Sequence, residues 1–158
     1  MLDGERHLLR HAVATLAYRG GKVMRGAPAG FGDVRIQADT RSALEILAHM
    51  GDVLSWAVRA TSGDESWQPE APRTWTAAVD RYYATLAQLD AALAREAPLS
   101  CSAESLLQGP IADALTHIGQ LATLRRVAGL PVPGEDYSIA EVVIGRVGPQ
   151  QSPAKFEF

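Results

Sequence analysis

Cysteine is almost absent from this sequence, because Cys101 is the only one among 158 residues. A lone thiol cannot form an internal disulfide, and an unpaired cysteine is typical of a reducing compartment. No histidine lies near it in the sequence to act as a base. We therefore interpret Cys101 as a small buried or loop thiol rather than as a nucleophile.

Long apolar runs, an excess of one charge and the common catalytic motifs are missing as well. No stretch reaches the roughly 18 apolar residues of a membrane span, and residues 1–6 lack the basic-then-apolar order of a signal peptide. The net charge is −3, without a block of lysine and arginine, which argues against a nucleic-acid partner. Walker, Rossmann, GxSxG and HExxH motifs are absent. We expect a cytoplasmic protein that binds neither membranes nor nucleic acids.

What the sequence does contain is a set of amphipathic segments. Hydrophobic residues make up 47% of the chain, enough for one substantial core, and the length fits a single domain over residues 1–158. Apolar residues recur at helical spacing in four segments, at about residues 4–24, 39–61, 74–97 and 102–128. No segment has a convincing strand pattern. The prediction is an all-α four-helix bundle over about residues 4–129, with an irregular tail over residues 130–158.

Local signals mark the ends of these helices and their connections. Ser42 and Glu45 have the spacing of a capping box, and Thr74 is a predicted N-cap. The links after the first and second helices are long enough for crossover connections, whereas the short link after the third predicts that helices three and four are antiparallel neighbours. Pro110 is expected to kink the last helix or to mark its true start. Residues 139–144, in the tail, form a short β-compatible run.

The fourth predicted helix carries the most informative polar residues. Its broad apolar stripe consists of Leu107, Ile111, Leu115, Ile118, Leu121 and Ala122. Beside the stripe runs a second row at heptad-like spacing, formed by Leu106, Pro110, Asp113, His117, Gln120 and Leu124. Asp113 and His117 stack on one face, about 40° apart around the axis, in a row that should point inward. The pair either chelates a divalent ion, or ties helices together by a hydrogen bond, or lies on a partly solvated seam.

The other three histidines differ in their position relative to the apolar faces. His49 lies at the edge of the apolar face of the second helix, and it is either a satisfied boundary residue or a ligand, depending on whether helices two and four are adjacent. Asp52, one turn away, either supports such a ligand or is solvated. His7 and His11 have HxxxH spacing, but they point away from the stripe of the first helix, and we expect them to face solvent. That stripe consists of Leu9, Val13, Leu16, Gly20 and Val23.

Two segments resemble the motifs of a known family. Residues 42–52, SALEILAHMGD, resemble the second-helix motif of the DinB-like superfamily, which comprises damage-inducible-type four-helix bundles with a metal site. Residues 112–129, beginning ADALTHIGQL and ending LRRVAG, resemble its fourth-helix motif, which is usually His-x-x-x-His-x-Gly-Gln with a closing Gly-x-Pro, here Gly129-Leu130-Pro131. The resemblance covers the predicted helices and leaves out the tail.

The resemblance implies that three residues bind the metal: His49, Asp113 and His117. Position 113 departs from the pattern, because the family usually has histidine there. Aspartate gives a set of two histidines and one carboxylate, which is chemically adequate for a divalent ion. The family usually binds zinc or nickel. Asp52 and Gln120 would then lie near the ligands as supporting groups.

The resemblance also implies a chemistry. Characterised members include transferases and isomerases that use low-molecular-weight thiols such as mycothiol or bacillithiol. The leading hypothesis is therefore a metal-dependent thiol S-transferase-like enzyme with a small-molecule substrate. One alternative is a metal-binding stress-response protein without turnover that acts as a homodimer, and another is a metal-assisted hydrolase. A deep cleft ending at the three residues would favour an enzyme, and a closed, fully coordinated site a binding protein.

Overall fold

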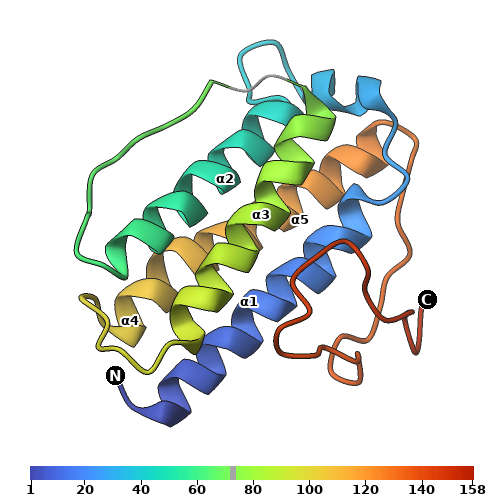
Figure 1. Ribbon diagram of the computed structural model, residues 1–158. Helices are drawn as coiled ribbons and strands as arrows, with labels where there is room; N and C mark the ends of the chain where they lie inside the picture. The colour runs from blue at the N-terminus through green and yellow to red at the C-terminus, as the bar shows by residue number, and fades with distance from the viewer. Residues whose placement is uncertain (72–73) are drawn as a thin grey trace.

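The computed structural model describes residues 1–71 and 74–158, and its helices form four long segments (Figure 1). Three of them are single helices: α1 (Asp3–Met24), α2 (Ala43–Ala60) and α3 (Trp75–Ala94). The fourth is continuous and has three parts: α4 (Ala103–Leu106), a π-helical turn (Leu107–Ile111) and α5 (Ala112–Val127). The all-α prediction is confirmed, since the one β-type pairing in the described ranges is an isolated bridge between Glu135 and Glu157. Across these same ranges, every helix is too short or too polar to cross a membrane.

Capping side chains fix where α2 and α3 begin. The Ser42 hydroxyl accepts a hydrogen bond from the Glu45 amide at 3.3 Å, and the Glu45 carboxylate accepts one from the Ser42 amide at 2.7 Å. This is the predicted capping box, and it starts α2 at Ala43 rather than near residue 39 or 40. Thr74 caps α3 as predicted, accepting a hydrogen bond from the amide three residues later at 3.1 Å.

The helices are arranged so that α1 and α2 each lie between α3 and α5, which are diagonally opposite (Figure 1). The prediction that helices three and four are neighbours is therefore wrong. The link of residues 95–102 is short, but eight extended residues reach about 26 Å. If neighbouring helices are about 10 Å apart, two diagonally opposite helices are about 14 Å apart. The link is therefore long enough to join them. A short link thus permits a diagonal connection.

The connection after α2 returns along the outside of that helix, as Figure 1 shows for residues 61–71. The Trp56 indole N–H donates to the Glu65 carbonyl at 3.0 Å, and the Asp52 carboxylate accepts from the Glu70 amide at 3.0 Å. These bonds hold the connection against α2. As a result, α3 starts at the same end of the molecule as α2 and runs in the same direction, which is the crossover that the long link permits.

Pro110 lies inside the fourth segment, in the π-helical turn, and does not mark its start. Ser102 caps the segment instead, with its hydroxyl accepting from the Ser105 amide at 3.1 Å. A π-helical turn inserts an extra residue and so rotates the residues before it relative to those after it. Leu106 is consequently 1% exposed and Leu107 45% exposed. The predicted stripe, which included Leu107, is wrong at this end.

The core of α1 follows the predicted stripe, whose five residues are all buried. Gly20 serves a close approach of α3, because a Cβ atom there would lie 2.7 Å from the Tyr82 hydroxyl. That hydroxyl donates a hydrogen bond to the Leu16 carbonyl at 2.9 Å. In the connection before α2, Ala29–Asp33 form a 3-10 helix that buries Phe31 edge-on against the α3 side of the core.

The tail lies over α1 and is irregular, as predicted (Figure 1). The Tyr18 hydroxyl donates to the Glu135 carboxylate at 2.5 Å. Lys22 pairs with both Glu135 and Glu157 at 2.7 Å. The run at residues 139–144 is irregular rather than a strand, because no partner strand lies beside it in the described part of the chain.

Candidate metal centre

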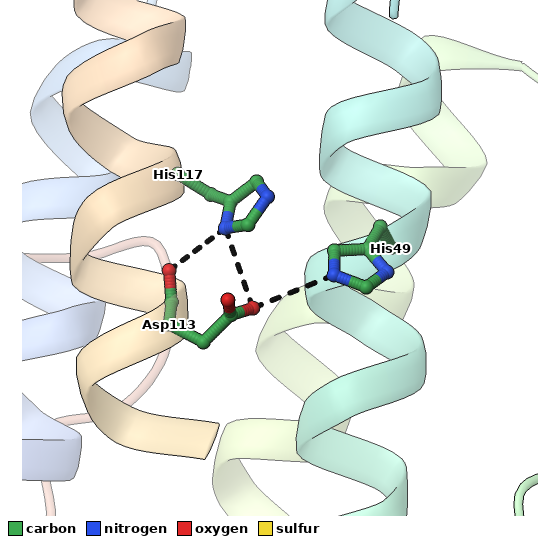
Figure 2. A group of neighbouring side chains, drawn as sticks. All are labelled: His49, Asp113 and His117. Atoms are coloured by element: carbon green, nitrogen blue, oxygen red, sulfur yellow. Dashed lines mark hydrogen bonds and ion pairs between the residues drawn. The ribbon is translucent and has the colours of Figure 1, made fainter. Parts of the chain in front are cut away.

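Three side chains from two facing helices converge between α2 and α5 (Figure 2). His49 comes from α2, and Asp113 and His117 come from α5. Each offers one ligand atom, and the three atoms lie within 4.8 Å of one another. Asp113 Oδ2 is 3.5 Å from His49 Nε2 and 3.3 Å from His117 Nδ1. The predicted residues are therefore brought together, and α2 and α5 are neighbours, as this requires.

The row of α5 that carries Asp113 and His117 faces inward. His117 is 8% exposed and Leu124 of the same row is buried, whereas Gln120 at the edge of the row is exposed. His117 Nδ1 lies 2.8 Å from the main-chain carbonyl oxygen of Asp113. Because a carbonyl oxygen only accepts, Nδ1 carries the proton in this contact, and the lone pair of the neutral ring lies on Nε2. A hydrogen bond of this kind fixes the orientation of an imidazole ligand, and Figure 2 shows the free nitrogen directed into the gap between the helices.

The inner carboxylate oxygen of Asp113 is the feature that fits a cation best. Oδ2 is buried and accepts no hydrogen bond within residues 1–71 and 74–158. A buried carboxylate oxygen is costly unless a donor or a cation compensates it. Ligand atoms about 2.1 Å from a tetrahedral ion are about 3.4 Å apart. The 3.5 Å between this oxygen and His49 Nε2 matches that spacing.

Burial and neighbouring charges favour the neutral form of His49. Burial lowers the pKa of its imidazole, and the charges of Arg41 and of a protonated His117 lower it further, against the opposing effects of Asp113 and Asp52. The ring therefore stays neutral to a lower pH than an isolated histidine. The neutral form is the one that binds a metal ion.

Two open cavities adjoin the three residues, one on each side. The cavity on the His117 side has a volume of about 350 Å³ and includes Arg41 and Gln120 in its wall. The cavity on the other side has a volume of about 420 Å³ and is lined by His49, Asp113, Val53, Trp56, Trp67, Gln108, Gly109 and Pro110. Small molecules therefore have access to the ligand residues from two directions.

Asp52 and Gln120, the predicted supporting groups, have different surroundings. Asp52 is 7% exposed, accepts a hydrogen bond from the Glu70 amide and pairs with Arg81 at 2.8 Å. The solvated alternative for Asp52 is therefore wrong, because Arg81 reaches the buried carboxylate from α3. Within the described residues Asp52 makes no hydrogen bond to an imidazole. Gln120 is exposed in the cavity beside His117, with no hydrogen bond to it in the described part of the chain.

The remaining candidates lie away from this site. His7 and His11 are exposed on α1, as the stripe predicts, and among the described residues they belong to no cluster that could hold a metal. Cys101 is partly buried, and burial raises the pKa of its thiol. A raised pKa disfavours the thiolate, which agrees with its interpretation as a loop thiol.

Two residues beside the site were not predicted from the sequence. Arg41 directly precedes the capping box of α2, which is a signal that could have drawn attention to it. Trp67 is 52% exposed in the connection after α2, and its ring centroid lies 6.3 Å from that of His49. An aromatic residue in a polar loop is noticeable in a sequence, but the path of the loop that brings it to His49 depends on tertiary contacts.

Comparisons with protein-family models, with curated proteins and with solved structures find no match for this chain. The interpretation of the site therefore depends on its own geometry. That geometry consists of two imidazoles and a carboxylate from facing helices, with an open cavity on either side.

Proposed function

We propose that this chain is a DinB-like four-helix bundle in which His49, Asp113 and His117 bind one divalent ion, zinc or nickel. The observation that carries the proposal is the convergence of their three ligand atoms within 4.8 Å, from two different helices. The buried Asp113 Oδ2 without a hydrogen-bond donor in the described ranges supports it, because a cation would compensate its charge. Imidazole nitrogens suit zinc and nickel alike.

The ligand set would leave such an ion reactive rather than saturated. Two neutral imidazoles and one carboxylate provide three ligands and a single negative charge, so a divalent ion would keep a net charge near +1 and an open position. An ion held in this way lowers the pKa of a thiol or a water molecule beside it. The two adjoining cavities favour an enzyme over a closed binding site.

We therefore propose a metal-dependent thiol S-transferase-like enzyme as the function of this site. Its substrates would be a low-molecular-weight thiol and a small electrophile. The thiol S–H bond would break with loss of its proton to solvent, and the sulfur would form a bond to the electrophilic carbon. The bond from that carbon to its leaving group would break at the same time, and the leaving group would depart with the electron pair. His49 and His117 would contribute imidazole nitrogens as ligands, and Asp113 would supply the one negative charge of the set. The 420 Å³ cavity, with Trp56 and Trp67 in its wall, provides an apolar surface for the electrophile.

Elemental analysis of the purified protein tests the metal site. Wild type should carry about one equivalent of zinc or nickel, and His117→Ala should lose it because one of three ligands is gone. His11→Ala is the matched control, since it removes an exposed histidine, and it should retain the metal. Stoichiometric metal in His117→Ala would remove His117 as a ligand and contradict the proposal.

Conjugation assays with several low-molecular-weight thiols and electrophiles test the chemistry. The metal-loaded wild type should exceed His49→Ala by at least about a hundredfold, as expected when an electrostatic group of an active site is lost. Equal rates in the two proteins, with metal retained by wild type, would contradict the enzyme and support a metal-binding protein without turnover. Metal-dependent hydrolysis in place of conjugation would assign the open position to water.

A further inference from the structure

The cavity on the His117 side has one charged side chain in its wall. Arg41 contributes it, and the polar residues around it are uncharged: Thr40, Gln120 and Thr123. Apolar side chains complete the wall: Ile36, Ile46 and Leu124. Among the described residues, none of those that line this cavity is acidic, so a positive charge lies next to His117 without a negative charge in the same wall.

The guanidinium of Arg41 is available for a ligand. Within the described ranges, no hydrogen bond or ion pair reaches it from another residue. Asp39 is the nearest acid along the chain, and within the described ranges it forms no hydrogen bond or ion pair with Arg41. The next acid, Glu45, already accepts a hydrogen bond from the Ser42 amide at 2.7 Å and pairs with Arg35 at 3.5 Å. Elsewhere in the protein a guanidinium does pair with a carboxylate, as Arg81 does with the buried Asp52.

The cavity on the opposite side of the three residues has the reverse character. Its wall includes two tryptophans, and Asp113 is the one acidic residue among the described residues that line it. In the metal-free protein, a carboxylate there would be repelled by Asp113 and would meet no cationic side chain among the described residues of the wall. The difference in charge between the two cavities decides on which side an anionic group would bind.

We propose that Arg41 binds the carboxylate of a small organic acid that reacts at His49, Asp113 and His117. The guanidinium presents planar paired N–H donors that match a carboxylate, and the apolar side chains of the same wall accept the carbon skeleton. A volume of about 350 Å³ limits the ligand to a small molecule. This inference rests on the proposed function for the reaction, but Arg41 and its cavity stand independently of the metal.

An NMR titration with benzoate tests the proposal, with uncharged benzamide as the matched probe. The titration uses the protein as purified and is repeated after chelation of metal. Benzoate should shift the backbone amides of residues 40–41 and 120–124 under both conditions, and benzamide should bind at least about tenfold more weakly. Arg41→Gln should weaken benzoate binding by at least about tenfold, and Arg41→Lys by less, since a charge remains. Arg95→Gln removes an exposed arginine at the far end of α3 and should leave binding unchanged.

The outcomes separate this proposal from the metal site. Equal benzoate affinity in wild type and Arg41→Gln would overturn it, as would the absence of saturable binding. Benzoate binding that is lost on chelation but unchanged in Arg41→Gln would mean that the carboxylate binds the metal. That result would overturn the role of Arg41 and support the metal site. Arg41-dependent binding in a protein that carries no metal would support this inference while the proposed function fails.

Discussion

Helices α1 and α5 each carry two ionisable residues four positions apart, but one pair faces solvent and the other the interior. His7 and His11 are exposed on α1, whereas His117 of the Asp113–His117 pair is buried. Side chains four positions apart share a face in any helix, so their spacing is the same. The difference is the facing helix, because α2 presents His49 to α5. A chelating spacing becomes a candidate site only where a third ligand lies across from it.

The two helices also differ in how well their apolar periodicity predicts the buried face. On α1 every residue of the predicted stripe is buried. In the fourth segment the predicted stripe is buried or partly buried from Ile111 onward, but Leu107 is exposed. The π-helical turn between them changes the register. Periodicity is thus a reliable guide only while the helix keeps 3.6 residues per turn.

The largest expected effect concerns this register. Leu106→Ala should lower the free energy of unfolding by about 2–5 kcal/mol, because it removes a fully buried side chain from a packed core. Leu107→Ala should change it by less than about 0.5 kcal/mol, as for other exposed positions. Urea unfolding of both variants measures the difference. Equal losses would mean that the helix keeps an α-helical register through Pro110.

A second effect separates a metal ligand from a structural residue. Zinc at about a hundred times its dissociation constant should stabilise wild type by about 2.7 kcal/mol, and a variant that binds a hundredfold more weakly by less than about 0.5 kcal/mol. Asp113→Ala should behave as such a variant. Without metal its stability should stay within about 1 kcal/mol of wild type, because Oδ2 accepts no hydrogen bond within the described residues. Thermal or urea unfolding with and without zinc gives both numbers.

The matched control for Asp113→Ala copies the pair onto α1. His7→Asp creates an aspartate four residues before His11, at the spacing found on α5, but on an exposed face without a third ligand. In an Asp113→Ala background it should restore no zinc stabilisation. Restored stabilisation would show that spacing alone makes the site and that the facing helix is unnecessary.

The smallest effect is the pH dependence of the metal-free protein. Burial lowers the pKa of His49 in the folded state, whereas the unfolded chain has an ordinary value of about 6.5. Between these two values the unfolded chain binds more protons, so stability falls as the pH is lowered from about 6.5 through the folded pKa. NMR titration should give a midpoint for His49 below about 6.5. His49→Gln should remove this part of the pH dependence, and an unchanged slope would contradict the assignment to His49.

Much of the helical layout could be predicted from residues close together in sequence. The capping box of Ser42 and Glu45 and the N-cap Thr74 are where the sequence places them, since caps depend on the adjacent turn alone. The relation between α3 and α5 could not be predicted, because residues 95–102 are long enough for either a neighbouring or a diagonal connection. The partner of Asp52 was missed for a similar reason, since Arg81 belongs to another helix.

The sequence by itself determined that Asp113 and His117 share one inward face, because that relation is fixed by the geometry of a single helix. Only the tertiary structure decided that His49 lies across from them and that Arg41 and Trp67 border the site. The physical reason is that local geometry depends on bonds within one turn. Which helices face each other depends instead on how the whole chain buries its apolar surface.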